Sequence, residues 1–359
     1  MFEFLNNWLA NGSFWVAVPL IIVGCAALIK GADFLVDGAS ALAKKYGVSD
    51  IVIGLTVVAF GTSMPEFVVN MVAVGQGSTE IAITNVLGSN IINIFVILGC
   101  TALIFPISSQ KSTRRFDIPF SLLAALLVLL FAVYNSPSWL QIEHIFNMNI
   151  ADPTLSDLGS IQMGQGNGGF ISGVGGSILL IFFLIFLWHN FKGIGSAPQT
   201  ESNEEYKPMS ARRALALIIG GLVGLVVGGE VIVKSATSIA QSLGVSDAII
   251  GLTVVALGTS LPELATSCMA AFKKNCDIAL GNVIGSNLFN IFFILGTSAC
   301  VKALPGYHGL EIDALMAALG SVLVMLFVYL TKKHEIKRWH GAILLLTYAA
   351  YLTYRIITV

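Results

Sequence analysis

The sequence is poor in charge, in histidine and in paired cysteine, and each shortage excludes a class of protein. Charged residues make up 11% of the 359 residues, whereas soluble domains carry about 25%. The formal net charge is only −1, so composition gives no sign of a basic surface for nucleic acid. No C-x-x-C or H-E-x-x-H pattern occurs and the five cysteines lie scattered, which argues against a disulfide framework and a zinc enzyme. We expect no enzymatic activity, no bound cofactor and no obligatory protein partner.

Long apolar runs dominate what is present. Hydrophobic residues make up 56% of the chain and the mean hydropathy is +0.85, so we predict an all-α integral membrane protein. The opening MFEFLNNWLANGSF lacks the basic region of a cleaved signal peptide, and we expect the first apolar run to remain as a membrane helix. A bilayer core of about 30 Å takes about 20 apolar residues per helix. That rule predicts ten helices, near residues 15–43, 49–76, 80–106, 117–134, 170–191, 212–242, 246–272, 277–302, 310–331 and 339–358.

Lysine and arginine fall almost entirely in alternate loops. Fifteen of the 19 lie after the first, third, fifth, seventh and ninth predicted helices, and only Lys302 and Arg355 lie on the other side. The positive-inside rule assigns the basic loops to the cytoplasm. We therefore expect a multi-pass protein of the cell (inner) membrane, surrounded by the lipid bilayer, with both termini outside.

One stretch of sequence occurs twice. GVSDIVIGLTVVAFGTSMPE at 47–66 aligns without a gap with GVSDAIIGLTVVALGTSLPE at 244–263, and 16 of the 20 pairs are identical. The same offset aligns NVLGSNIINIFVILG at 85–99 with NVIGSNLFNIFFILG at 282–296. Each copy contains five predicted helices, an odd number, so the two copies must be inverted relative to each other. Inverted repeats with a site near the membrane midplane are common in transporters.

The repeat also sets the expected domain organisation. We predict a first repeat at 1–192, a short cytoplasmic linker at 193–211 and a second repeat at 212–359. The first repeat includes a long outside loop at 135–169, which we expect to be irregular. The linker is too short for a folded regulatory domain.

The duplicated Pro-Glu interrupts predicted helices two and seven. Pro65 has no N–H and its ring clashes with the carbonyl four residues earlier, so we expect a broken helix with bare carbonyls between Ala59 and Thr62. Thr62, Ser63 and Glu66 share one face at helical spacing. The second copy repeats the set around Pro262, with Ala256, Thr259, Ser260 and Glu263.

Predicted helices three and eight add a polar stripe each. Asn85, Ser89 and Asn93 recur every four residues, and their equivalents in the second copy are Asn282, Ser286 and Asn290. Together the four helices supply two carboxylates and many neutral oxygens but no histidine or thiol. Hard cations such as Ca²⁺ prefer these ligands, whereas zinc and copper do not.

Other polar residues in the predicted helices suit structural roles. Asn90 and Asn287 point off the stripes, and we expect them to serve helix packing or interhelical hydrogen bonds, with contact to an ion as the alternative. Lys30 with Asp33, and Glu230 with Lys234, have the spacing of ion pairs within a helix. A role of Asp33 and Glu230 in gating or in the ion path is the alternative.

The paired G-T-S-x-P-E and G-S-N-x-x-N motifs resemble the α-repeats of the calcium/cation antiporter superfamily, on its sodium/calcium exchanger branch. The resemblance covers both halves and implies ten helices, with Ca²⁺ and Na⁺ competing at a central site. By position it implies Ca²⁺ ligands at Glu66 and Glu263. It further implies that the Ca²⁺ and Na⁺ sites are completed by the Ala59 and Ala256 carbonyls and by Thr62, Ser63, Thr259, Ser260, Ser89, Asn93, Ser286 and Asn290.

One departure concerns the charge of this site. Some exchangers carry an aspartate at the position of Asn290, whereas here Asn93 and Asn290 are both neutral. Two carboxylates balance one Ca²⁺, and the missing acid argues against potassium co-transport. The sequence therefore predicts a secondary active transporter that exchanges Ca²⁺ for Na⁺ by alternating access. The alternatives are an H⁺-coupled divalent-cation antiporter and a cation channel.

Overall fold

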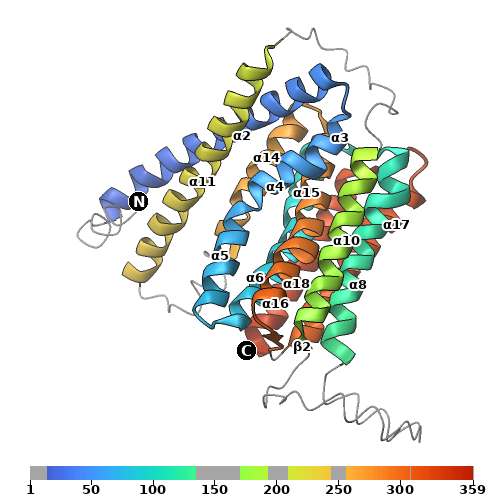
Figure 1. The fold of residues 1–359 in the computed structure, drawn as a ribbon. Coiled ribbons are helices and arrows are strands. Elements are labelled where there is room, and N and C mark those ends of the chain that lie inside the picture. The colour runs from blue at the N-terminus through green and yellow to red at the C-terminus, as the bar shows by residue number, and fades with distance from the viewer. Residues whose placement is uncertain (1–13, 135–169, 193–208, 244–255, 308, 359) are drawn as a thin grey trace, which may run out of the picture.

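The computed structural model describes residues 14–134, 170–192, 209–243, 256–307 and 309–358, and these residues are almost entirely helical (Figure 1). The first half contains α2 (Phe14–Tyr46), α3 (Asp50–Ile53), η1 (Gly54–Val58), α4 (Ala59–Thr62), α5 (Met64–Gly75), α6 (Thr79–Ile92), η2 (Asn93–Leu98), α7 (Gly99–Ile104), η3 (Thr113–Asp117), α8 (Ile118–Tyr134) and α10 (Gly173–Lys192). The second half contains α11 (Ala211–Ser242), α13 (Ala256–Thr259), α14 (Leu261–Phe272), α15 (Cys276–Leu288), η6 (Phe289–Leu295), α16 (Gly296–Val301), α17 (Leu310–Leu330) and α18 (Arg338–Thr358). The η stretches are π-helical and continue the helices on either side of them.

The observed helices agree with the predicted membrane segments where the structure describes them. Within the described residues, seven helices are long and apolar enough to cross a membrane, and the bent pair formed by Asp50–Thr62 and Met64–Gly75 raises the number to eight. The predicted seventh segment begins before the described residues resume at Ala256, and α18 is not among the seven. The protein is thus a multi-helix membrane protein, and ten spans remain a prediction. The loop 135–169 and most of the linker 193–211 lie outside the described residues.

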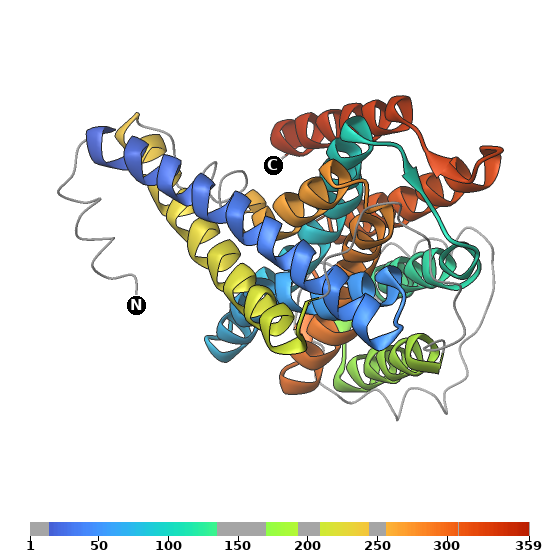
Figure 2. The same cartoon turned by 90° about the horizontal axis from the view of Figure 1, so that it is seen from above.

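Two long helices, α2 and α11, lie side by side along one flank of the other helices (Figures 1 and 2). Glycines make this contact close. A Cβ added at Gly221 would lie 2.7 Å from the carbonyl oxygen of Gly31, and one at Gly228 would lie 2.7 Å from that of Gly24. Backbones that approach this closely gain packing contacts that replace the hydrophobic effect, which does not drive association inside a bilayer.

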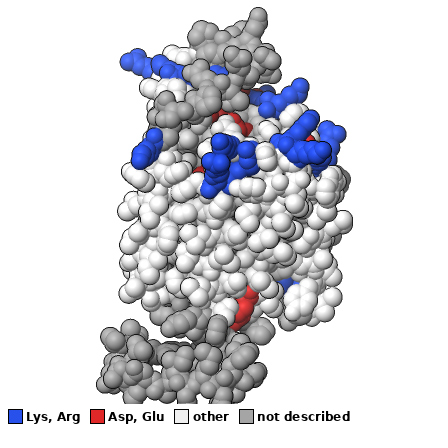
Figure 3. All heavy atoms as spheres, turned by 90° about the vertical axis from the view of Figure 1, so that its right-hand side faces the viewer, with Lys and Arg blue, Asp and Glu red and all other residues white. Residues whose placement is uncertain are grey.

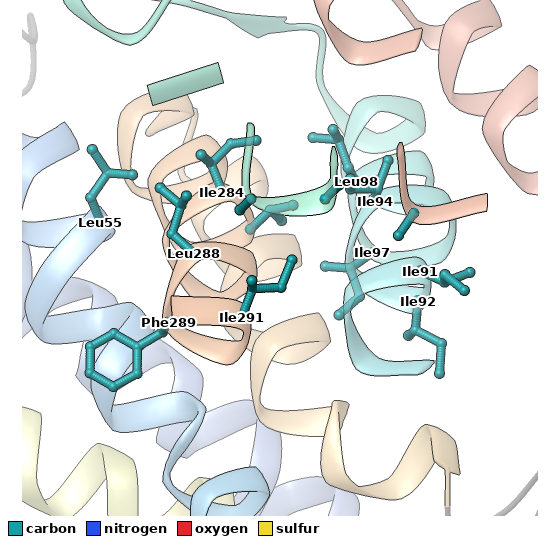
Figure 4. Close-up of a cluster of buried hydrophobic side chains, with 14 of the residues drawn as sticks. Leu55, Ile91, Ile92, Ile94, Ile97, Leu98, Ile284, Leu288, Phe289 and Ile291 are labelled. Atoms are coloured by element: carbon teal, nitrogen blue, oxygen red, sulfur yellow. The ribbon is translucent and has the colours of Figure 1, made fainter. Parts of the chain in front are cut away.

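The centre of the remaining bundle is formed by α6 with η2 and α15 with η6. Aliphatic side chains from these helices pack together in Figure 4, among them Ile94, Ile97, Ile284 and Ile291. The span that contains α15 and η6 is 94% buried, against 28% for α2. Polar groups on the central helices are therefore shielded from lipid by the other helices.

Several elements of each half pair with or pack against elements of the other half. Strand β1 (Ile107–Ser108) pairs with β4 (Glu335–Ile336) of the second half, and β2 (Phe170–Ile171) pairs with β3 (Leu304–Pro305). Likewise α10 packs on α16, and α18 packs on α7. Corresponding elements of the two copies thus make corresponding contacts across the molecule.

On the face that Figure 3 shows, charged side chains lie at the two ends of the molecule. Figure 3 shows lysine and arginine side chains concentrated at one end, with an uncharged band below them. The β1–β4 pairing brings the segments that carry Lys111 and Lys337 to the same end. At the other end a buried cluster joins α17 to α18, because the Asp313 carboxylate accepts hydrogen bonds from Tyr307 Oη at 2.6 Å and Tyr351 Oη at 2.8 Å and pairs with Arg355. Burial, with the charge of Asp313, raises the pKa of Tyr307, which keeps its hydroxyl a donor.

Candidate functional site

The helix that carries the first Pro-Glu breaks at Ser63. The segments before and after this residue are inclined by 45°, and Ser63 itself leaves helical geometry with φ −84° and ψ 6°. Pro65 occupies the first turn of α5, where its missing N–H leaves no donor for the carbonyl four residues back. The structure differs from prediction at Ala59, whose carbonyl accepts the Ser63 N–H at 3.0 Å. The Thr62 hydroxyl also lies 3.3 Å from this oxygen, so the Ala59 carbonyl is not bare.

The second copy has the same break. Helix α13 ends at Thr259, α14 begins at Leu261, and Ser260 between them has φ −89° and ψ 5°. Ala256 is the first residue described after the gap at 244–255, and its backbone lies in α13. Both breaks therefore present a helix C-terminus and a helix N-terminus to the same region.

The serines at the two breaks bond to the opposite half of the protein. Ser63 Oγ donates to Glu263 Oε1 at 3.1 Å, and Ser260 Oγ lies 3.5 Å from Glu66 Oε1 and 3.4 Å from Ser89 Oγ. The pattern S-x-x-E ordinarily forms a capping box, in which the serine oxygen accepts a backbone N–H of its own helix. Neither serine makes that cap here. Both hydroxyls instead form hydrogen bonds with the glutamate carboxylates of the opposite half. Both glutamates also lie in the first turns of their helices, where the helix dipole stabilises a negative charge.

The first residues of the two polar stripes hold the backbone of the broken helices. Asn85 Nδ2 donates to the Glu66 carbonyl oxygen at 3.4 Å, and Asn282 Nδ2 donates to the Glu263 carbonyl oxygen at 3.3 Å. Thr62 Oγ1 donates to Asn282 Oδ1 at 3.1 Å, so this predicted ligand is tied to helix α15. The Asn85 and Asn282 amides thus hold the backbone of the two glutamates in place.

The last residues of the stripes lie where π-helical stretches replace the α-helix. Asn93 opens η2 and Asn290 lies in η6, and π-helical turns occur frequently at functional sites. Each donates its amide to the other half, Asn93 to Asn287 Oδ1 and Asn290 to Asn90 Oδ1, both at 3.0 Å. The expected interhelical hydrogen bonds of Asn90 and Asn287 are confirmed. The π-helical stretches were not predicted, because nothing in the local sequence pattern marks them.

Six oxygens of the predicted ligand set are buried and have no hydrogen-bond partner. They are Glu66 Oε2, Glu263 Oε2, Asn93 Oδ1, Asn290 Oδ1, Ser286 Oγ and Thr259 Oγ1. A buried polar atom without a partner costs about 1–3 kcal/mol, and more when charged, so such a group of oxygens suits a bound cation. Within the described residues no three His, Cys, Asp or Glu side chains lie close enough together to hold a metal. This site therefore combines two carboxylates with neutral oxygens.

Two supporting residues were missed by sequence reasoning. Asn70 Oδ1 accepts a 2.7 Å hydrogen bond from Asn85, and Ser267 Oγ accepts one of 2.9 Å from Asn282. Both residues are fully buried. They occupy equivalent positions in the two copies, but one is an asparagine and the other a serine, so identity between the repeats does not identify them. The sequence signal that could have identified them is their polarity within an otherwise apolar helix.

The predicted ion pairs within the long helices form, and one lysine adds a further link. Lys30 lies 3.7 Å from Asp33, and Lys234 lies 3.3 Å from Glu230. Lys273, at the end of α14, approaches Asp33 at 2.6 Å and Asp37 at 2.5 Å. This lysine joins α2 to the bundle from outside the site.

Comparison with known proteins finds relatives along the whole chain. The profile of the family described as sodium/calcium exchanger protein matches residues 16–192 and 213–357. The putative antiporter CaxA of Alkalimonas amylolytica is 35% identical over 342 residues, covering 94% of this chain and 97% of that protein. The sodium/calcium exchanger MaX1 of Methanosarcina acetivorans is 33% identical, covering 93% and 96%. A solved structure of the sodium-calcium exchanger NCX_Mj superposes with a TM-score of 0.75 at 32% identity, covering 95% of this chain and 99% of that one.

Proposed function

The chain belongs to the sodium/calcium exchanger protein family, and from this we propose that it exchanges Ca²⁺ for Na⁺ across a membrane by alternating access. The observation that carries the proposal is the group of six unpartnered buried oxygens, to which both halves contribute. Two of them belong to Glu66 and Glu263, whose combined charge balances one Ca²⁺. The other four oxygens are neutral, and neutral oxygens can also coordinate Na⁺.

The predicted residues take distinct roles in this mechanism. Glu66 and Glu263 supply the charge and bind Ca²⁺, while the Ser63 and Ser260 hydroxyls hold one oxygen of each carboxylate and leave the other for the ion. Neutral oxygens complete the coordination, from the side chains of Thr259, Ser286, Asn93 and Asn290 and from the carbonyls of Ala59 and Ala256. Thr62 and Ser89, which also belong to the proposed ligand set, bond to Asn282 and Ser260.

Exchange follows from the cost of an empty site. Ionised carboxylates at membrane depth are costly, so two of them without a cation disfavour the transition between facing states. A bound cation removes this cost and permits the switch. We assign the moving part to α2 and α11, which pack closely on each other and are far less buried than the central helices.

Protons are the second candidate for the coupling ion, because two buried carboxylates can be neutralised by protons as well as by metal ions. The relatives that are named as sodium/calcium exchangers support Na⁺ over H⁺ as the proposed coupling ion. For orientation, we propose that the end rich in lysine and arginine lies in the cytoplasm and that both termini lie outside, in a cell membrane.

The test is calcium flux into vesicles that contain the purified protein. We expect Ca²⁺ uptake when Na⁺ is higher inside than outside, and none when K⁺ replaces Na⁺. Uptake that follows a pH gradient and ignores Na⁺ would identify the proton-coupled antiporter instead. Calcium flux that needs no counter-ion would indicate a channel and contradict exchange.

A further inference from the structure

Four asparagines form a closed hydrogen-bonded set where the two central helices cross. Asn90 and Asn93 come from α6 and η2, and Asn287 and Asn290 come from α15 and η6. All four are at least 97% buried. Only Asn93 and Asn290 belong to the predicted ligand set, so Asn90 and Asn287 need a separate explanation.

Asn90 and Asn287 are held by each other's backbone. Asn90 Nδ2 donates to the carbonyl oxygen of Asn287 at 3.2 Å, and Asn287 Nδ2 donates to that of Asn90 at 3.3 Å. This reciprocal bonding fixes which end of each amide is the oxygen. It leaves Asn90 Oδ1 and Asn287 Oδ1 as acceptors that face the neighbouring asparagines.

Those acceptors in turn determine the orientation of the ligand asparagines. Asn290 directs its NH₂ group to Asn90 Oδ1, and Asn93 directs its NH₂ group to Asn287 Oδ1. The oxygens Asn290 Oδ1 and Asn93 Oδ1 are left without a partner. A flipped amide would place an oxygen against an oxygen and turn its NH₂ group toward the cation, which can bind only an oxygen.

We propose that Asn90 and Asn287 are positioning residues that orient the amides of Asn290 and Asn93, so that carbonyl oxygens and not NH₂ groups face the transported cation. The inference rests on the proposed function, since it assumes that a cation binds there. It explains how a site limited to two carboxylates keeps a complete oxygen shell. A carboxylate offers an oxygen in either orientation, whereas an amide needs a fixed partner.

The alternative is that these bonds only hold the two helices together. A double-mutant cycle distinguishes the two roles, because orientation matters for an amide and not for a carboxylate. The variants are Asn90→Leu, Asn290→Asp and their combination. The measurement is the Ca²⁺ concentration that half-maximally raises the unfolding temperature of the purified protein, which requires no transport.

We expect Asn90→Leu to weaken Ca²⁺ binding about tenfold, because Asn290 is then free to present its NH₂ group. Combined with Asn290→Asp, the same change should not weaken Ca²⁺ binding, because a carboxylate at position 290 needs no partner to present an oxygen and loses only the Asn90 oxygen that faces it. An equal loss in both backgrounds would overturn the proposal, since a helix-packing role does not depend on residue 290. The matched control is Asn190→Leu, which removes a buried amide bonded to the Phe186 carbonyl on α10 and should act equally in both backgrounds.

The twofold arrangement supplies a second cycle if Asn90→Leu does not fold. Asn287→Leu should weaken Ca²⁺ binding, and Asn93→Asp should remove that effect. Wild-type protein in the vesicle assay separates the two hypotheses. If it exchanges Na⁺ for Ca²⁺ but the cycles are additive, the positioning role alone is wrong. If Ca²⁺ neither stabilises it nor is transported, both proposals are wrong.

Discussion

At the scale of single residues, the site departs from the local bonding that its sequence favours. A serine three residues before a glutamate at a helix start is expected to cap that helix. Ser63 and Ser260 give up these caps, worth about 1 kcal/mol each, and bond to the glutamate of the other half. Local stability is lost to arrange two carboxylates, which is typical of functional sites.

The two carboxylates can be tested one at a time. We expect Glu66→Gln and Glu263→Gln each to reduce Ca²⁺ transport to background, because one remaining charge cannot balance Ca²⁺. Calcium at 100 times its dissociation constant should stabilise the wild type by about 2.7 kcal/mol and should not stabilise either variant. Thermal unfolding with and without Ca²⁺, beside the flux assay, measures both effects.

The matched control for this pair is Glu80→Gln. Glu80 also lies in the first turn of its helix but is exposed. Its variant should transport Ca²⁺ and be stabilised by it as the wild type is. Normal transport by Glu66→Gln or Glu263→Gln would contradict the assignment of the site.

At the scale of helices, the contact between α2 and α11 depends on backbone approach and not on side-chain volume. Glycines from both helices face each other along its length, and a Cβ at several of them would overlap the partner's backbone. Small residues of this kind give a smooth surface along which helices pack closely in lipid. The pair can thus move as one unit.

Two adjacent glycines of α11 test this packing. A Cβ at Gly221 would lie 2.7 Å from both the Gly31 oxygen and the Leu35 nitrogen, whereas one at Gly220 would meet nothing within 4 Å. We expect Gly221→Ala to destabilise the protein by about 1–3 kcal/mol and to lower transport. Gly220→Ala should be neutral or stabilising by up to about 1 kcal/mol. Thermal unfolding compares the two, and equal effects would contradict close packing at Gly221.

At the scale of the whole molecule, one lysine ties the α2–α11 pair to the bundle. Lys273 at the end of α14 contacts two acids of α2, while the equivalent position of the first half is Gln76. The two halves are therefore linked to the long helices unequally. Under the proposed mechanism this contact favours the described arrangement over the other facing state.

Removing this link should shift the balance between facing states. Lys273→Gln removes partly exposed ion pairs worth up to about 1 kcal/mol, which corresponds to a change of up to about fivefold in the ratio of the two states. The measurement is half-saturating Ca²⁺ on each side of vesicles with uniformly oriented protein. We expect the ratio of the two values to change, and high salt to reduce the difference between Lys273→Gln and wild type.

The neighbouring Lys274 provides the control for that experiment. Lys274 is exposed, and no ion pair of this residue occurs within the described part of the chain. Lys274→Gln should leave the ratio unchanged. The same shift in both variants would mean that general surface charge, and not the contact with α2, sets the balance.

The sequence alone predicted the helical membrane architecture, the family and the residue types at the site. These follow from local regularities, since apolar run length identifies membrane helices and spacings of three or four residues place polar groups on one face. The repeat made the prediction stronger, because each motif could be read twice. The break in the helix was expected from Pro65, although the bonded state of the Ala59 carbonyl was not.

Only the tertiary structure decided which groups meet. The bonds from Ser63 to Glu263, from Ser260 to Glu66 and among the four asparagines join residues about 200 positions apart. No local periodicity encodes such pairings, which arise when the two copies pack against each other. Whether an amide offers its oxygen or its nitrogen to an ion depends on the partner it meets in that packing. For this reason the sequence predicted the ligand types, whereas the orientation of the amides is determined by the tertiary structure.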